Sequence, residues 1–215
     1  MMESAAAYEA ASALREALFG NAIEAQRYAS EASRTAVGRE VQYATALALA
    51  FTGKEVDRQV EKLSRDLARR FPRDTLVQSH FLPTIKAQQL LNRREPKSAL
   101  DALEVTSAYE LGVVGVTSFS PNLYPIYVRG EAHLMDGNGK QAESEFKKIL
   151  KHRGLTFNEP ICVFARLGVA RAQSLKGDQT AARQSYKELL EIWKEADASV
   201  PLLLTVRREL PEILR

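Results

Sequence analysis

The side chains best suited to metal chemistry in this sequence are three histidines, His80, His133 and His152, and the single cysteine, Cys162. Imidazole nitrogen and thiolate sulfur are strong zinc ligands, and structural zinc sites usually take two ligands from one short stretch of chain. No two of these four residues have such a spacing. We therefore expect no metal site, and no other cofactor.

Phosphate chemistry is suggested by one tetrapeptide, Gly137-Asn138-Gly139-Lys140, because glycine and lysine are typical of phosphate-binding loops. The glycine that such a loop needs further upstream is absent, and Gln141 stands where a metal-binding Ser or Thr is required. The pair His152-Arg153 precedes Gly154 and not the aspartate of a kinase catalytic loop. We therefore interpret the tetrapeptide as a turn between helices and expect no catalytic residues.

Three basic clusters would suit phosphate groups: Arg69 to Arg73, Arg93 to Lys97, and Lys147 to Arg153. All three fall where helices are expected to end, and solvated basic side chains are common there. The whole chain has 30 Lys and Arg against 27 Asp and Glu, with a formal net charge of +3, and the two signs alternate along it. Nucleic-acid-binding proteins usually gather such a surplus on one face, so nucleic acid is not an expected partner.

The composition is that of an ordinary folded domain, with 45% hydrophobic and 27% charged residues among 215. Only 7% of the residues are aromatic and alanine dominates the apolar share, which favours closely stacked helices. No apolar run approaches the roughly 18 residues of a membrane-spanning helix, and residues 1–21 lack the pattern of a signal peptide. We expect no membrane contact and a cytoplasmic location, or a periplasmic one if the chain follows a membrane span in a longer parent protein.

Five times the chain shows an apolar helical segment that ends in a turn and is followed by a second amphipathic segment. A small residue lies seven positions before each turn, and the residue five positions after it is alanine in four cases. The turns lie at Gly20, Gly53, Arg94, Gly137 and Gly177, the small residues are Ala13, Ala46, Ala87, Gly130 and Ala170, and the later residues are Ala25, Arg58, Ala99, Ala142 and Ala182. The pattern predicts an array of closely packed helix pairs.

The second segments keep a helical period on their apolar side, and the second of them is expected to stop before Pro72. The final segment, 201–215, begins with proline and carries an apolar stripe that includes Leu203 and Val206. A helix of this kind would cover the open end of a helical stack.

With its small residue, turn glycine, alanine and aromatic residue at fixed offsets, the pattern resembles the tetratricopeptide repeat (TPR). The fourth unit matches best, through Gly130, Gly137, Ala142 and Phe146. The turns are 33, 41, 43 and 40 residues apart, against a usual period of about 34, so longer helices or loops are expected, among them a long connection at 107–122.

The resemblance implies an all-α fold, specifically an α–α superhelix (a TPR-like helical-repeat solenoid) of about five helix pairs plus a C-terminal capping helix. The whole chain, 1–215, would then be a single repeat domain. Its units are expected at 4–36, 37–73, 75–106, 122–153 and 159–196, with the capping helix at 201–215.

A narrower resemblance rests on Leu123-Tyr124-Pro125, on Phe146 to Leu150 and on Trp193-Lys194. These residues look like the C-terminal TPR region of some bacterial eukaryotic-type serine/threonine kinases and related multidomain regulators. The resemblance implies that the chain is the regulatory or scaffold part of a larger bacterial signalling protein. Any kinase activity would belong to that parent protein, because this chain carries no kinase motif.

In TPR arrays the first helix of each unit lines a concave face, and particular offsets point into it. Carried onto this sequence, these offsets select a protein- or peptide-binding groove of Tyr43, Phe81, Thr84, Gln88, Tyr124, Tyr127, Glu131, Phe164 and Arg171. Tyrosine combines a large contact area with a polar end, which suits peptide recognition, although the same aromatics would also fill a core. The lysine and asparagine clamp of chaperone-binding members is not seen. The resemblance therefore implies a scaffold module that binds a peptide or protein segment.

Two alternatives from other classes stay open. One is a small-molecule ligand-sensing domain that controls an attached kinase or transcription regulator, with a pocket formed by Tyr124, Tyr127 and the 107–122 connection. A bound ligand would raise the thermal stability of such a domain. The other is a dimerisation spacer, and a homodimer of this kind would show a mass that depends on concentration.

Overall fold

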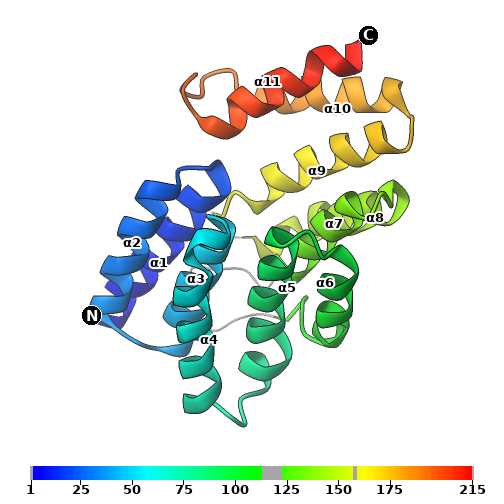
Figure 1. Ribbon diagram of the computed structural model, residues 1–215. Coiled ribbons are helices and arrows are strands. Elements are labelled where there is room, and N and C mark those ends of the chain that lie inside the picture. The colour runs from blue at the N-terminus through cyan, green and yellow to red at the C-terminus, as the bar shows by residue number, and fades with distance from the viewer. Residues whose placement is uncertain (1, 113–122, 157–158, 215) are drawn as a thin grey trace.

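The computed structural model describes residues 2–112, 123–156 and 159–214, with side chains described as far as Glu209. Throughout these ranges the regular structure is helical and contains no strand, which confirms the predicted all-α class (Figure 1). The α-helices are α1 (Met2–Phe19), α2 (Ala22–Thr35), α3 (Arg39–Phe51), α4 (Asp57–Arg70), α5 (Leu82–Asn92), α6 (Pro96–Leu103), α7 (Tyr124–Met135), α8 (Gly139–Lys151), α9 (Ile161–Leu175), α10 (Gln179–Ile192) and α11 (Pro201–Leu214).

Shorter helical segments adjoin some of these helices. Three are 3₁₀-helices, η1 (Lys54–Val56), η3 (Glu104–Ala108) and η4 (Arg153–Leu155), and η2 (Val77–Phe81) is a π-helical stretch that runs directly into α5. Helix α4 ends at Arg70, as expected from Pro72. The predicted connection at 107–122 begins with the end of η3 and a turn as far as Gly112, and its remaining part, 113–122, lies outside the described residues.

All five predicted turns between paired helices are present, and Gly53 differs from the other four in its extended ψ of -179°. The residue at each turn has a positive φ: 87° at Gly20, 120° at Gly53, 64° at Arg94, 78° at Gly137 and 82° at Gly177. This left-handed region is open to glycine at little cost, so glycine terminates four of the first helices. At four of the turns, the next N–H also donates to the carbonyl five residues earlier, for example Asn138 to His133 at 2.7 Å. Four of the five predicted turns therefore share a hydrogen bond as well as a positive φ.

The helices pack in sequence as two layers. Helices α1, α3, α5, α7 and α9 pack side by side, and each also packs against the helix that follows it, so that α2, α4, α6, α8 and α10 form the second layer (Figure 1). Helix α3 is enclosed on all sides, because every residue from Val41 to Ala50 is buried. The first helix of each pair therefore supplies most of the core.

Small residues allow the close approach that the sequence predicts. A Cβ atom at Gly130 of α7 would lie 2.6 Å from the ring of Phe146, and one at Gly168 of α9 would lie 2.5 Å from the same ring. Phe146 of α8 is completely buried between them. The alanines of the repeat pattern are also completely buried: Ala13, Ala25, Ala46, Ala87, Ala99, Ala142, Ala170 and Ala182.

The first helix contacts the last part of the array. The ring of Phe19 lies 5.1 Å from that of Phe164 and 6.4 Å from that of Trp193, measured between centroids. Gly20 approaches Pro201 so closely that an added Cβ would lie 3.1 Å from the proline side chain. In an open solenoid each repeat contacts only its neighbours, so these contacts close the described array upon itself.

Helix α11 lies against α9 and α10 at the C-terminal end (Figure 1). Its Leu203 and Val206 are buried, and Val206 packs with Leu167 and Tyr186. Within the described residues, no helix has the length and apolar character that a bilayer span requires.

Candidate functional site

The structure places the nine predicted groove residues mostly in the interior. Seven of them are buried: Tyr43, Phe81, Thr84, Gln88, Tyr124, Tyr127 and Phe164. Glu131 and Arg171 are the two that keep partial exposure. Of these nine residues, a partner could therefore reach only this oppositely charged pair directly in the isolated chain, and the role of all nine in binding stays a prediction.

The first part of the predicted groove is a packed contact between α3 and η2. The ring of Tyr43 stacks on that of Phe81 at 4.0 Å, with only 6° between the ring planes. Thr84 is fully buried, and its hydroxyl donates to the backbone carbonyl of His80 at 2.6 Å. These side chains fill the space between α3 and the η2–α5 segment.

A second aromatic group joins α1, α3, α7 and α9. Phe51 lies 6.3 Å from Tyr124 and 6.1 Å from Tyr127, and Tyr127 lies 6.4 Å from Phe164, which in turn contacts Phe19. Aromatic pairs at such distances add to the stability that area burial provides. The aromatic rings of these four helices therefore pack against one another.

The partly exposed pair, Glu131 and Arg171, belongs to a polar cluster formed by α7, α9, α10 and α11. The guanidinium of Arg171 donates two hydrogen bonds to the carboxylate of Glu209, from Nε at 3.1 Å and from Nη2 at 2.7 Å. The Tyr186 hydroxyl donates to the same carboxylate at 2.8 Å. Glu131 and Tyr127 face Arg171 from α7. We refer to Tyr127, Glu131, Arg171, Tyr186 and Glu209 as the Arg171 cluster.

The ionisation of the Arg171 cluster reflects its partial burial. Burial alone would lower the pKa of Arg171, but the bonds to Glu209 and the charge of Glu131 outweigh it and raise that pKa. Burial raises the pKa of the Glu131 carboxyl, and Arg171 opposes the rise while Glu209 adds to it. One guanidinium thus serves two carboxylates, of which only Glu209 accepts its two-point hydrogen bond.

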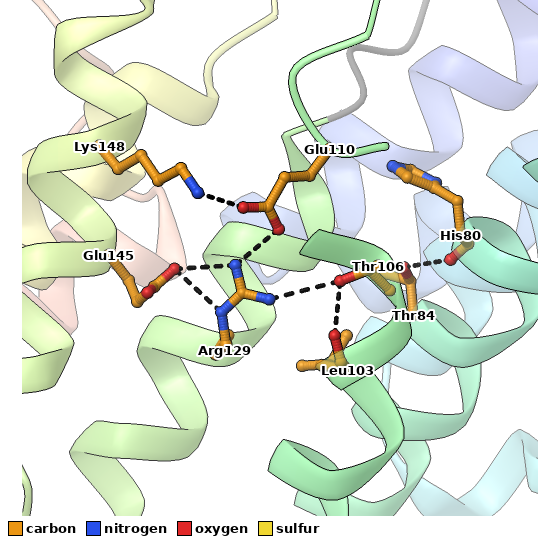
Figure 2. A network of polar contacts seen from close by, with 8 residues as sticks. All are labelled: His80, Thr84, Leu103, Thr106, Glu110, Arg129, Glu145 and Lys148. Atoms are coloured by element: carbon orange, nitrogen blue, oxygen red, sulfur yellow. Dashed lines mark hydrogen bonds and ion pairs between the residues drawn. The ribbon is translucent and has the colours of Figure 1, made fainter. Parts of the chain in front are cut away.

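A second polar cluster ties the turn after η3 to α7 and α8, as Figure 2 shows. Arg129 donates to Glu110 at 2.6 Å, to Glu145 at 3.0 Å and to the Thr106 hydroxyl at 3.3 Å. Lys148 donates to the other oxygen of Glu110, whose side chain is completely buried. Burial would lower the pKa of Arg129, but the bond to Glu110 and the charge of Glu145 raise it overall. Each charge has a partner, so this cluster anchors the turn and leaves no group free to react.

A third polar contact joins the first and last parts of the array. Arg15 of α1 donates to Glu159 at 3.0 Å, and the Tyr124 hydroxyl donates to the other oxygen at 3.3 Å. Burial raises the pKa of the Glu159 carboxyl, although Arg15 opposes the rise. Glu110, Glu159 and Glu209 were not predicted from the sequence. No local pattern marks them, since their partners lie 19 to 144 residues away.

Of the residues first considered for metal and phosphate chemistry, His133 lies near Arg129 and Glu145 of the second cluster, and Lys148 belongs to it. Across the described ranges, no three His, Cys, Asp or Glu side chains gather in a way that would hold a metal ion. Gly137 to Lys140 forms the turn between α7 and α8, as interpreted from the sequence.

Hollows in the surface lie between neighbouring helices. A pocket of about 370 Å³ lies between α4 and α5 and is lined by residues that include Arg65, Ala68, Leu82 and Lys86. A smaller one of about 200 Å³ lies among α8, α9 and α10. The first of these is within the size range of pockets that hold small molecules, about 300–1,000 Å³.

Comparison of the chain with models of known protein families, with curated protein sequences and with solved structures finds no match. The functional argument therefore rests on the repeat pattern and on the geometry described above.

Proposed function

We propose that this chain is a protein-interaction module of the tetratricopeptide type, a superhelical array of helix pairs that holds a peptide or protein segment. The observation that carries this proposal is the recurrence of one turn. Five helix pairs are joined by turns at which one residue has a positive φ, each at the same offset from the small residues of the repeat pattern. Repeat arrays of this kind offer extended, rigid surfaces to other proteins. In this proposal the chain is the regulatory part of a larger bacterial signalling protein.

The Arg171 cluster is the surface on which we place recognition. Arginine binds carboxylates through a planar two-point hydrogen bond, and in the isolated chain Glu209 of α11 occupies that fork. A partner segment with a carboxylate would take the place of Glu209 on Arg171, with Glu131 excluding a second negative charge. Binding would therefore compete with the docking of α11.

Affinity capture from a lysate of the source cell tests this function. The buried tyrosines are poor sites for such a test, because replacing them with alanine would leave cavities and lower the free energy of unfolding by several kcal/mol. We compare the intact chain with Arg171→Ala, and use Arg166→Ala as a matched control, since Arg166 is an exposed arginine on the same helix. All variants are checked for full helicity.

A partner held by the intact chain and by Arg166→Ala, but lost from Arg171→Ala, is the expected result. The variant Glu209→Ala frees the fork and should capture the partner more strongly. Equal capture by all four proteins would contradict recognition through Arg171. Capture by none of them would contradict a protein-binding function altogether.

A second candidate function is a ligand-sensing domain that controls an attached kinase or transcription regulator. Tyr124 and Tyr127, which were expected to line its pocket, are buried, and 113–122 lies outside the described residues. The pocket between α4 and α5 is the feature that favours this candidate. It predicts that a small molecule raises the melting temperature of the chain in proportion to the logarithm of its concentration above Kd. The same thermal measurement without added ligand provides the baseline.

A further inference from the structure

The pocket between α4 and α5 combines an apolar floor with two free cations. Ala68 of α4 and Leu82 of α5 provide the apolar part, and Arg65 and Lys86 stand on the two helices that form its walls. Both basic side chains are exposed, and neither has an ion-pair partner in the part of the chain that the structure describes. An apolar body with a negative head would match both features.

The acidic residue at the pocket does not cancel these cations. Glu61 lines the pocket, but its carboxylate lies 3.3 Å from Arg93, which is held in turn by Asp57 at 2.9 Å. The Gln89 side chain is also committed, because its amide donates to Asp57 at 2.9 Å. An anion entering the pocket therefore meets Arg65 and Lys86 as the unpaired charges.

The volume of the pocket is enough for a small molecule and too small to enclose two turns of a helix. An α-helix with its side chains is about 10–12 Å across, so two turns of it occupy about 1,000 Å³. The pocket offers about 370 Å³, which accommodates one extended acyl chain.

We infer that the pocket between α4 and α5 binds a small amphipathic monocarboxylate, with its alkyl chain against Ala68 and Leu82 and its carboxylate between Arg65 and Lys86. This site shares no residue with the Arg171 cluster and does not depend on the proposed protein-binding function. An alkyl chain gains affinity with each methylene that it buries. The carboxylate gains from two charge-assisted hydrogen bonds, which are shorter and stronger than neutral ones.

Isothermal titration with hexanoate, octanoate and decanoate below their micelle-forming concentrations tests the inference on the whole chain. Kd should fall about two- to four-fold for each added methylene. Decanol, which has the same chain and no charge, should bind at least about five-fold more weakly than decanoate. Amide chemical shifts should change in α4 and α5 and not in α9 or α11.

Variants locate the site. Arg65→Gln and Lys86→Gln should each weaken decanoate about three- to five-fold without changing decanol. Ala68→Phe should fill the apolar part of the pocket and abolish the binding of both decanoate and decanol. Arg58→Gln, which makes the same charge change at an exposed position of α4 outside the pocket lining, is the matched control and should bind as the intact chain does.

Melting curves and helicity confirm that each variant is folded. If decanoate does not bind, or binds equally to the intact chain and to the variant with both Arg65→Gln and Lys86→Gln, the inference is wrong. Equal affinity for decanol and decanoate would also overturn it. An acidic peptide that binds at these residues where decanoate does not would show the occupant to be a protein segment.

Discussion

At the scale of single residues, the clearest structural constraint is the contact between two glycines and one ring. Phe146 lies between Gly130 and Gly168, and neither position has room for a Cβ atom. We predict that Gly130→Ala lowers the free energy of unfolding by about 1–3 kcal/mol, because overpacking forces the ring or the helices to move. Urea denaturation measures the change.

Gly154 provides the control for this prediction. It lies in η4, and an added Cβ there would meet no atom within 4 Å. Gly154→Ala should change stability by less than about 0.5 kcal/mol. Equal effects at Gly130 and Gly154 would show that the helices α7 and α8 do not approach as closely as described.

Glu143 links the stability of the chain to pH. Burial would raise the pKa of its carboxyl, but bonds from Lys147, Lys176 and Gln173 outweigh burial and lower the pKa to about 2. A carboxyl with a lowered folded pKa stabilises the fold above its unfolded pKa of about 4.5 and loses this contribution as pH falls toward 2.

Glu143→Gln should therefore be less stable than the intact chain at pH 7 by about 1–3 kcal/mol. The difference between the two proteins should shrink as pH falls from about 4.5 to about 2. Thermal unfolding at several pH values measures it, and Glu188→Gln at an exposed position of α10 is the control. A difference that does not change with pH would contradict the role given to Glu143.

At the scale of helices, local chemistry is enough to predict the turns. A glycine adopts a positive φ at low cost wherever it stands, so Gly20, Gly137 and Gly177 mark helix ends in the sequence itself. Arg94 shows that the repeat carries further information, because the turn there was predicted from its offset to Ala87 and Ala99 and adopts the same conformation without glycine. The π-helical start of α5 has no comparable local signal.

The docking of α11 depends on a few contacts at one end of the array. Leu203 and Val206 are buried, and Glu209 binds Arg171 and Tyr186. We predict that Glu209→Ala speeds amide hydrogen exchange in α11 about ten-fold, because the lost charge-assisted bonds are worth about 1.5 kcal/mol. Exchange in α3 and α5 should stay unchanged, and Glu191→Ala at an exposed position is the control.

Unchanged exchange in α11 after Glu209→Ala would mean that the apolar contacts alone hold this helix. The competition between α11 and a partner segment would then lose its basis. Faster exchange throughout the chain would instead show that α11 supports the whole fold.

At the scale of the whole molecule, the contact between Arg15 and Glu159 joins residues 144 positions apart. We predict that Arg15→Ala costs about 2 kcal/mol of stability, because among the described residues the buried carboxylate of Glu159 then keeps only the Tyr124 hydroxyl as a hydrogen-bond partner. Arg34→Ala, at an exposed pair with Glu31 on α2, should cost less than about 0.5 kcal/mol. Equal costs in denaturant unfolding would argue against the closed arrangement.

This closure explains why the candidate groove was harder to predict than the turns. The offsets identified side chains that lie mostly on the first helices of the pairs, and seven of the nine are buried. Whether Tyr124 and Tyr127 meet solvent or other rings depends on Phe51, two units earlier, and on Phe164 of the next unit. Contacts of this range follow from the sum of small rotations between helix pairs, which no local spacing encodes.

The most direct test of the account is the affinity of the captured partner segment for four proteins: the intact chain, Arg171→Ala, Glu209→Ala and the control Arg166→Ala. We predict at least about ten-fold weaker binding to Arg171→Ala, tighter binding to Glu209→Ala and no change for Arg166→Ala. One affinity for all four proteins would contradict recognition through the Arg171 cluster.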